Sequence, residues 1–552
     1  MSIFNSIKVK RPGRNRFNLS HQVKTTIKFG GAFPFICLPV VPGDTLKEYM
    51  EFVMRFAPFT APVMHNINVY THFFFVPNRL VWDEWEDFIT QGETGEETPV
   101  YPTYLLQDVN ENFTGAGSLI DYLGFPVNDS APYVPTGKFY EIDALPVRAY
   151  NLIYNEYYRD QNYTDEIEIF KNESGQVVVD SELVIPPYKE MFFVRNRAWK
   201  KDYFTSALPW PQRGPDVMLP IQGEAPLTRV KNAPPFELDS EWPYNSVDNG
   251  LTIQGVPQQN ETDMPAYIAS SGSSGQVRHM LGINPDSLRV DMSNVSSATI
   301  NELRRAIAAQ QFYEARARGG SRYIEQIYSI FGVKSSDARL QRPEYLGGGK
   351  SNVVISDVLQ TSQTTETSAQ ATPSGTGIAI GKSHSFKRFF EEHGWVIGIM
   401  SVVPKAAYQQ GMNKLFLKKD PLEYYWPQFA HLGEQEIKTK EIFYTPMASP
   451  NAPVPENEVT FGYTPRYAEY KFMNDSVHGS FRNTLDFWHM GRIFKNAPSL
   501  NTDFLTNFQS ASRPFAITED DKTSNTDKIW VNIQNNLIAV RPMPKYGTPR
   551  II

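Results

Sequence analysis

The chain has 552 residues, 41% of them hydrophobic and 13% aromatic, with 41 prolines and a formal net charge of −7. This composition allows a sizeable core and argues against a helical bundle, because aromatic residues favour strands and prolines favour long, stiff connections. A single cysteine excludes a disulfide framework, and there is neither a signal peptide nor a run of 18 apolar residues. We therefore expect a soluble chain, folded in a reducing compartment, without membrane insertion.

Charge is distributed unevenly along the chain. No acidic residue precedes Asp44 and none follows Asp527, whereas these two ends hold 11 basic residues. The rest of the chain has 42 basic and 60 acidic residues, a charge of −18. Residues 1–20 contain Pro, Gly and few apolar residues, which predicts a basic N-terminal arm ahead of one folded domain over residues 21–552.

The first expected elements are strands. Residues 21–41 read as a pair of strands broken at Gly30 and Gly31. In residues 46–56 the apolar positions fit helical spacing nearly as well as the alternation of a strand, so both interpretations stay open.

Residues 63–75 predict the strand around which the chain is organised. Their odd positions are mostly β-branched or aromatic, and their even positions are polar or amphipathic until Phe74. A period of two indicates a strand with one buried face that becomes buried on both faces at its end. Pro77 ends the strand, and a short helix with an apolar stripe follows, which Gly92 can end.

More helices and strands are expected further along. An amphipathic helix is expected over residues 147–158. A capping box at residues 299–302 predicts a helix that runs to Gly319, and a second helix follows over residues 321–331. Strands resume over residues 394–403, 469–473 and 529–540.

Three long stretches between these elements predict insertions. Residues 93–136 are rich in Gly, Pro, Asp and Asn, which predicts a long ordered loop. Residues 212–296 combine many prolines with a Ser/Gly-rich stretch, which predicts a surface protrusion. Residues 346–385 have no aromatic side chain and many Ser and Thr, which predicts a polar loop without a core.

Strands separated by very long loops, with only a few short helices, favour a mainly β fold. An antiparallel sandwich with large insertions accounts for this pattern. The capsid jelly roll is one member of that class, and the pattern alone does not select it.

Six stretches, in the same order across most of the chain, resemble the major capsid proteins of microviruses (Microviridae), in the gokushovirus-like branch of these small single-stranded-DNA bacteriophages. The first is THFFFVPNRLVWDEW, the second is NEYYRDQN and the third is KDYFTSALPWPQRGP. They cover residues 71–85, 155–162, 201–215, 317–348, 391–416 and 469–494.

The resemblance implies a specific fold and function. It selects a single jelly roll that self-associates into a T=1 icosahedral shell around circular single-stranded DNA. It also implies scaffolding and minor virion proteins as partners, assembly in the host cytoplasm, residence in the virion, and a protruding loop that attaches to a host surface receptor. The alternative, motivated by 28 Tyr and 9 Trp, is a carbohydrate-binding or carbohydrate-active β-sandwich, but we find no convincing carboxylate pair.

No catalytic, metal or cofactor site is predicted. Residues 377–383 nearly spell a phosphate-binding loop but are one residue short between the glycines. His65 and His72 are seven residues apart on a strand, so they point to opposite faces and do not form a metal site. The Glu391-Glu392-His393 cluster is interpreted as a solvated turn. We therefore expect a protein that is not an enzyme.

Residues 316–322 contain three arginines beside two glycines. They fit a nucleic-acid contact, because such arginines can approach phosphates closely. They also fit a helix C-terminus whose cations complement the helix dipole, and we favour this structural interpretation.

The basic ends give the stronger signal for DNA contact. Cations interleaved with aromatic residues suit single strands, where phosphates pair with charge and bases stack on rings. Acid-free tails could instead contact the acidic body of a neighbouring subunit. The predicted DNA contacts are Lys8, Lys10, Arg11, Arg14 and Arg16, with Arg541, Lys545 and Arg550 as weaker candidates.

Overall fold

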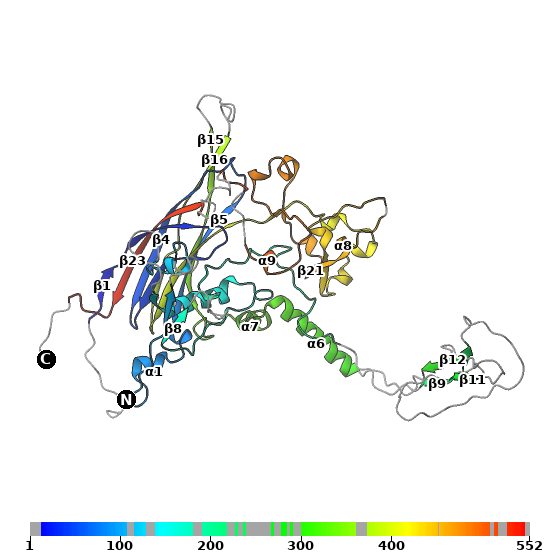
Figure 1. Ribbon diagram of the computed structural model, residues 1–552, viewed down its shortest axis with the longest axis horizontal. Helices are drawn as coiled ribbons and strands as arrows, with labels where there is room; N and C mark the ends of the chain where they lie inside the picture. Colours follow the sequence, from blue (N-terminus) through cyan, green and yellow to red (C-terminus); the bar gives the residue numbers. More distant parts are fainter. Residues whose placement is uncertain are drawn as a thin grey trace, which may run out of the picture. The chain divides into compact units, whose positions relative to one another are not determined.

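The computed structural model describes most of the chain (Figure 1). All structural statements below concern the described residues, and for the short strands between residues 227 and 290 only the backbone is described. The described residues are 13–107, 115–127, 139–179, 190–217, 227–229, 236–238, 267–269, 278–283, 288–290, 300–359, 373–450, 452–507, 513–516 and 527–546.

Two antiparallel sheets pack against each other as a β-sandwich. The seven-stranded sheet has the order β1-β23-β4-β16-β15, with β2 also paired to β23 and β17 to β4. Its strands are β1 (Asn15–Asn18), β2 (His21–Ile27), β4 (Thr45–Phe56), β15 (Val354–Leu359), β16 (Pro373–Lys382), β17 (Phe386–Phe389) and β23 (Ile529–Arg541). The four-stranded sheet has the order β14-β5-β18-β3, with strands β3 (Phe33–Val40), β5 (Ile67–Pro77), β14 (Glu344–Asn352) and β18 (Gly394–Pro404).

The order of these strands defines the topology. In chain order β2, β3, β4, β5, β14, β16, β18 and β23 alternate between the sheets, except that β5 and β14 are neighbours in one sheet. The resulting arrays, β2-β23-β4-β16 and β3-β18-β5-β14, have the strand order of a jelly roll. The predicted mainly β, antiparallel fold is confirmed.

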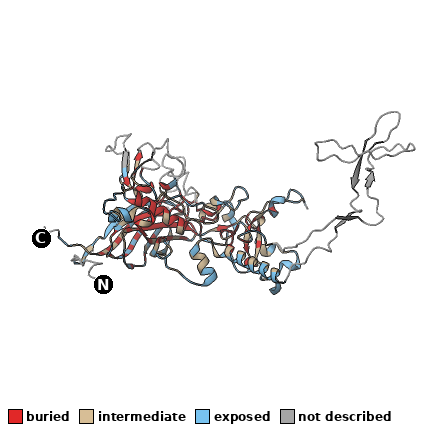
Figure 2. Ribbon diagram, turned by 90° about the horizontal axis from the view of Figure 1, so that it is seen from below, coloured by how far each residue is buried: buried red, intermediate tan, exposed pale blue. Residues whose placement is uncertain are grey.

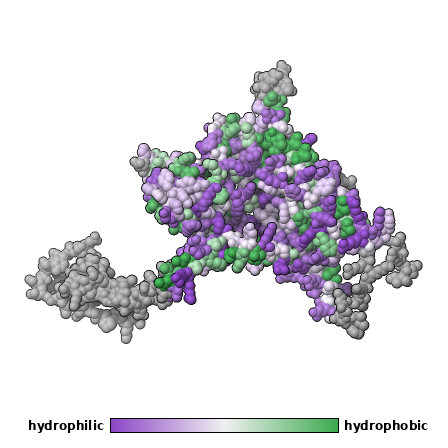
Figure 3. Space-filling view, turned by 180° about the vertical axis from the view of Figure 1, so that it is seen from behind, coloured by the Kyte–Doolittle hydropathy of each residue, from purple (hydrophilic) through white to green (hydrophobic). Residues whose placement is uncertain are grey.

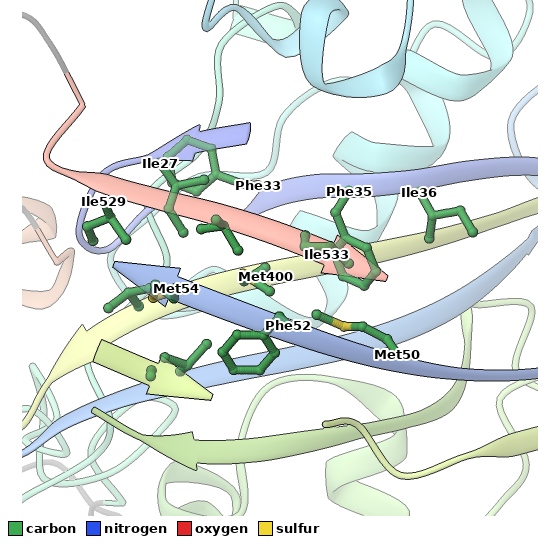
Figure 4. Close-up of a cluster of buried hydrophobic side chains, with 14 of the residues drawn as sticks. Ile27, Phe33, Phe35, Ile36, Met50, Phe52, Met54, Met400, Ile529 and Ile533 are labelled. Atoms are coloured by element: carbon green, nitrogen blue, oxygen red, sulfur yellow. The ribbon is translucent and has the colours of Figure 1, made fainter. Parts of the chain in front are cut away.

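One apolar cluster fills the space between the sheets. Phe59 stacks on Phe515 with ring centroids 4.7 Å apart, and Phe56 lies 6.0 Å from Phe59. Figure 2 shows buried residues concentrated in this part of the molecule. Side chains from both sheets meet in the cluster shown in Figure 4, among them Ile27, Phe33, Phe35, Met50, Phe52, Met54, Met400, Ile529 and Ile533.

The open question at residues 46–56 is settled in favour of a strand. β4 pairs with β23 along one edge and with β16 and β17 along the other. Buried and exposed residues alternate along it, from Leu46 inside to Arg55 outside. A strand buries all of the even positions at once, whereas a helix would bury only part of them, so cross-strand pairing decides the conformation.

The organising strand predicted over residues 63–75 is present as β5, but it begins at Ile67, so residues 63–66 lie before it. Its residues alternate between buried and half-buried up to His72, and those from Phe73 to Pro77 are all buried. The short helix that follows is split into η1 (Asn78–Leu80) and α1 (Trp85–Thr90). Gln91, with φ 61°, caps α1 just before Gly92.

The polar loop predicted over residues 346–385 is wrong, because β14, β15 and β16 occupy most of it. Glycines in β16 face phenylalanines of neighbouring segments: a Cβ at Gly377 would lie 2.9 Å from Phe59, and one at Gly381 would lie 2.7 Å from Phe52. The phenylalanine rings of the neighbouring segments fill the space beside β16, so this strand needs small residues there. Its sequence therefore lacks the aromatic residues that would have indicated a strand.

Two other strand predictions need correction. Residues 21–41 form two strands, but β2 and β3 lie in different sheets and are not a hairpin. Residues 469–473 are not a strand, because the positive φ of Tyr467 turns the chain into the 3-10 helix η9 (Ala468–Tyr470).

The connection between β5 and β14 builds a second apolar cluster. It contains β6 (Thr103–Gln107), β7 (Phe139–Asp143), β8 (Gln176–Val179), α3 (Leu119–Leu123), α4 (Ala144–Ile153) and the π-helix η2 (Tyr154–Tyr158). The predicted helix at residues 147–158 is confirmed, although nearly all of α4 is buried. Residues 93–136, predicted as a loop, also contain β6 and α3, because Tyr104 and Leu119 anchor them in this cluster.

The connection between β18 and β23 builds a third apolar cluster. Tyr203 and Phe204 from the earlier connection pack into it beside Ile437 and Phe461. Its elements are β19 (Ala407–Tyr408), η5 (Lys414–Phe416), η6 (Pro421–Glu423), η7 (Pro427–Phe429), β20 (Glu434–Lys438), η8 (Thr439–Glu441), α8 (Pro455–Glu458), β21 (Thr460–Pro465), β22 (Asp475–Ser476), η10 (Gly479–Arg482), η11 (Asp486–Trp488) and α9 (Thr502–Leu505).

Both helices predicted after residue 299 are confirmed. α6 covers Ile300–Gly319 and α7 covers Tyr323–Phe331. Gly332, with φ 69°, adopts the left-handed conformation that ends α7.

Residues 214–313 form a compact unit of their own. Within it β10 (Phe236–Leu238), β12 (Arg278–Ile283) and β11 (Tyr267–Ala269) make one small sheet, and β9 (Leu227–Arg229) pairs with β13 (Leu288–Val290). This unit covers most of the insertion predicted over residues 212–296.

Candidate nucleic-acid interface and assembly surfaces

The two basic ends of the chain lie side by side. β1 pairs with the end of β23, so that Asn15 is opposite Arg541 and Arg16 is opposite Val540. The Asn15 side chain also donates a hydrogen bond to the backbone of Met543 (2.6 Å). The predicted arm therefore ends before residue 15 rather than at residue 20, because residues 15–18 complete the edge of the sheet.

Four of the eight predicted DNA contacts are described, and they do not share one role. Arg14 places its guanidinium 5.2 Å from the ring centre of Phe389, and Arg16 is exposed on β1. Lys545 lies 5.8 Å from the exposed ring of Tyr546. The other four, Lys8, Lys10, Arg11 and Arg550, lie outside the described residues.

Arg541 has a structural partner. Its Nε lies 3.3 Å from Oδ2 of Asp44, and its Nη2 donates to the Pro39 carbonyl (3.2 Å). Burial raises the pKa of the Asp44 carboxyl, and the nearby Arg541 opposes that rise. Arg541 thus compensates a fully buried carboxylate, which makes it a weaker candidate for phosphate binding than Arg14 and Arg16.

The structural interpretation of residues 316–322 is supported. Arg318 pairs with Glu434 and donates to the Ser206 carbonyl (3.2 Å). Arg322 donates to the Asn155 carbonyl (2.7 Å), and its Nη1 lies 3.5 Å from Glu325. Both guanidinium groups are thereby used for contacts within the larger unit, at the C-terminal end of α6 and at the start of α7.

The other sites that sequence reasoning set aside also have structural roles. Glu392 accepts a hydrogen bond from Arg79 (2.7 Å), and His393 packs edge-on against Trp85. The near phosphate-binding loop is part of β16 and is extended rather than a cradle.

The two histidines of the organising strand region are each held by a hydrogen bond. His72 Nδ1 lies 2.8 Å from the Tyr158 hydroxyl, and His65 Nε2 lies 2.6 Å from the Lys405 carbonyl. Burial lowers the pKa of both to about 4, so both are neutral at physiological pH. Within the described ranges no three His, Cys, Asp or Glu side chains gather as a metal site. The helices of the described part are too short or too polar to cross a membrane.

Comparison with known proteins shows to which protein family the chain belongs. The family model described as "Capsid protein (F protein)" matches residues 5–551. The chain belongs to this capsid-protein family. It is 35% identical to "Capsid protein VP1" of Chlamydia phage 1, over 97% of this chain and 95% of the relative. It is also 35% identical to "Capsid protein VP1" of Bdellovibrio phage phiMH2K, again over 97% of this chain and 95% of the relative. "Capsid protein VP1" of Spiroplasma virus 4 is 31% identical, over 99% of this chain and 97% of the relative.

Membership fixes the broad function. This is a microvirus-type capsid protein with a structural rather than enzymatic role, and its place is in the virion. The resemblance drawn from six sequence stretches is confirmed. A carbohydrate-active sandwich is not supported, since neither the family nor the named relatives are enzymes of that kind.

Sequence reasoning missed several exposed apolar surfaces of this capsid protein. One lies on the connection between β18 and β23, where Phe416 is 79% and Met473 is 85% exposed. Another lies on the β15–β16 hairpin, where Figure 3 shows apolar surface below the grey tip at the top and Ile380 is 75% exposed. Large exposed apolar surface marks interaction sites. The run Tyr424-Tyr425-Trp426 is the signal in the sequence that could have revealed the first of these surfaces.

Proposed function

We propose that this capsid protein assembles into a closed T=1 icosahedral shell that encloses a single-stranded DNA genome. The observation that carries the proposal is the coincidence of a jelly-roll strand order with a capsid-family match over residues 5–551. The exposed apolar surfaces on the long connections support it, because they become buried when subunits meet.

The shell proposal is tested by sizing purified protein. Sixty copies of the 62.9 kDa chain give a particle of ~3.8 MDa, which light scattering and negative-stain images distinguish from a monomer. Uniform closed particles or their assembly intermediates are expected. A persistent monomer, even after addition of phage-infected lysate that supplies scaffolding and minor virion proteins, contradicts the proposal.

DNA contact by the basic ends is the second part of the proposal. The adjacency of β1 and the end of β23 gathers cations from both ends at one sheet edge, where phosphates can bind them. Changing Lys8, Lys10, Arg11, Arg14 and Arg16 to Gln should give shells that assemble but package poorly. Failure of empty shells would mean that the arm contacts a neighbouring subunit, and normal genome content would exclude the arm from DNA binding.

Host attachment is assigned to the unit of residues 214–313. A segment that forms a compact unit of its own suits a surface protrusion that recognises a receptor on the host. Replacing residues 254–276 with a short Gly/Ser linker should preserve shells, assembled in the host cytoplasm, and impair attachment. Loss of soluble protein would show that the segment is needed for folding instead.

A further inference from the structure

The two sheets of the jelly roll differ in what covers their outer faces. The outer face of the four-stranded sheet contributes Phe74, Val76, Ile397 and Ile399 to the second apolar cluster. The outward residues of β4 are exposed from Lys47 to Arg55, and those of β2 and of the start of β23, up to Asn532, are exposed as well. Among the described residues, the seven-stranded sheet therefore presents an open outer face.

This outer face carries an excess of positive charge, interspersed with the exposed apolar residues Val53, Ile378 and Ile380. The register of the strands places six exposed cations on it, and none of them has a carboxylate within 4.0 Å in the described part of the chain. The only acid at an outward position of β1, β2, β4, β16, β17 or β23 is Glu51, which is opposite one of these cations. The six cations are Arg16, Lys24, Lys47, Arg55, Lys382 and Lys387.

Two of these cations are directly opposite each other. Lys47 on β4 pairs in register with Lys387 on β17, and both are exposed. Like charges at directly opposed positions of a sheet are destabilising. A fold that keeps such a pair without an acid beside it gains stability when an anion binds between the two ammonium groups.

Aromatic rings lie among the cations. Trp530 is 46% exposed and pairs in register with Arg55 on one side and Thr26 on the other. Tyr49 is 39% exposed on β4, two positions from Lys47. Phe389, at the end of β17, carries the guanidinium of Arg14 over its ring.

An open cleft continues the face at the β2 edge. It has a volume of about 1410 Å³ and is lined by Lys24, Lys28, Arg55 and Trp530, with Asp527 as an acidic neighbour of Lys28. This exceeds the roughly 300–1,000 Å³ of a small-molecule site, so the cleft suits a chain-like ligand that runs along the face.

We propose that the outer face of the seven-stranded sheet is the principal binding surface for single-stranded DNA. Phosphates pair with the six cations, and bases stack on Trp530 and Tyr49. The exposed rings favour a single strand over an acidic protein segment, because unpaired bases offer flat faces to stack and carboxylates do not. The proposal rests on the proposed enclosure of DNA and transfers the main contact from the chain ends to this sheet.

The test compares two variants with the same change in charge. The sheet variant combines Lys24→Gln, Lys47→Gln, Arg55→Gln and Lys382→Gln. The control changes four exposed cations away from this face, Lys200→Gln, Lys334→Gln, Lys419→Gln and Lys495→Gln. Binding of a labelled oligothymidylate is measured across a salt series, together with the DNA content of purified particles.

The expected result is a specific loss in the sheet variant. Each phosphate contact on a single strand contributes about 0.7 to the salt slope, so losing four should reduce its magnitude by about 3. The control should keep the slope and the DNA content of the wild type. Equal slopes in the two variants would overturn the proposal. So would a sheet variant that no longer assembles but still binds the oligonucleotide with the wild-type slope, which would make the face a subunit contact.

A measurement on wild-type particles keeps the proposal testable if the sheet variant does not fold. Lysine acetylation, read by mass spectrometry, compares DNA-filled with empty particles. Lys24, Lys47 and Lys382 should be protected only in filled particles, whereas Lys334 and Lys419 should react equally in both. Equal reactivity of the sheet lysines in both particles contradicts the proposal. Absence of any particles in the wild type would instead contradict the shell itself.

Discussion

The two sheets of this jelly roll show opposite ways of using a β-sheet. The four-stranded sheet is buried on both faces, and its strand β18 is accordingly apolar along nearly its whole length. The seven-stranded sheet is buried on one face only, and its strand β4 alternates strictly between apolar and polar residues. The long connections therefore cover the outer face of the four-stranded sheet and leave the outer face of the seven-stranded sheet exposed among the described residues.

The largest expected effect comes from the outer face of the four-stranded sheet. Phe74 is 1% exposed and packs against Tyr157 at a ring distance of 4.7 Å. Phe74→Ala should destabilise the fold by about 3–5 kcal/mol, because it leaves a cavity between the sheet and η2, which contains Tyr157. Val53→Ala, on the outer face of the seven-stranded sheet, should change stability by less than about 0.5 kcal/mol. Chemical denaturation of both variants measures the contrast, and equal losses would contradict it.

The next effect tests the inner face of the seven-stranded sheet. Glu48 on β4 is 1% exposed, its carboxylate has no hydrogen-bond partner in the described part of the chain, and burial raises its pKa to about 8. Between pH 4.5 and 8 the folded state holds a proton that the unfolded state releases, so stability falls as the pH rises through this window.

Glu48→Gln should remove that pH dependence. The variant should match the wild type near pH 4 and exceed its stability by roughly 4 kcal/mol at pH 8. Thermal unfolding at the two pH values measures this, with Glu51→Gln, on the exposed face of the same strand, as the control. If the difference in stability between the wild type and the Glu48→Gln variant is the same at pH 5 and at pH 8, the Glu48 carboxylate is solvated and the prediction is wrong.

A smaller effect is expected where β16 approaches the core. Gly377→Val places a side chain against Phe56 and Phe59, with its Cβ within 3.1 Å of both rings, and should cost about 1–3 kcal/mol. Ile380→Val, on the exposed face of the same strand, should be nearly neutral. Comparing the two unfolding midpoints checks that β16 has one tightly packed and one open face. A neutral Gly377→Val would disprove the close packing.

The smallest effect separates stability from binding on the open face. Lys387→Gln relieves the opposition to Lys47 and should stabilise the DNA-free protein by about 0.2–1 kcal/mol. The same change should weaken oligonucleotide binding and reduce the salt slope by about 0.7. Unfolding and binding measured on one preparation test both signs, and a loss in both would point to a structural role for Lys387.

The elements that could be predicted from the sequence are those whose own side chains show apolar alternation, a continuous apolar run or a helix cap. β5, β18 and β23 follow from alternation or continuous apolar runs, and α6 follows from its capping box. β16 was missed because Phe52, Phe56 and Phe59 supply the apolar volume that its glycines lack. The helical turn at residues 468–470 was missed because the left-handed conformation of Tyr467 has no signal in a non-glycine residue.

The candidate DNA surface could be predicted only in part. The chain ends are visible as acid-free segments, and Arg16 was found there. Lys24 lies in the same acid-free segment as Arg16, whereas Lys47, Arg55, Lys382 and Lys387 lie in the acidic middle of the chain, where no local pattern joins the first two to the last two. They meet only through the register of β2, β4, β16, β17 and β23, which depends on pairings between residues hundreds of positions apart.

The place of β23 in the seven-stranded sheet sets the timing of folding during synthesis. β23 lies between β4 and the first strands of the chain, so β4 has its full partner only after residues 57–528 have been made. At about 5–20 residues per second the ribosome needs roughly half a minute or more for that stretch. Until then the backbone N–H and C=O groups along one edge of β4 are unpaired, and an unpaired strand edge can pair with other chains. A chain that ends before β23 would keep this edge of β4 unpaired.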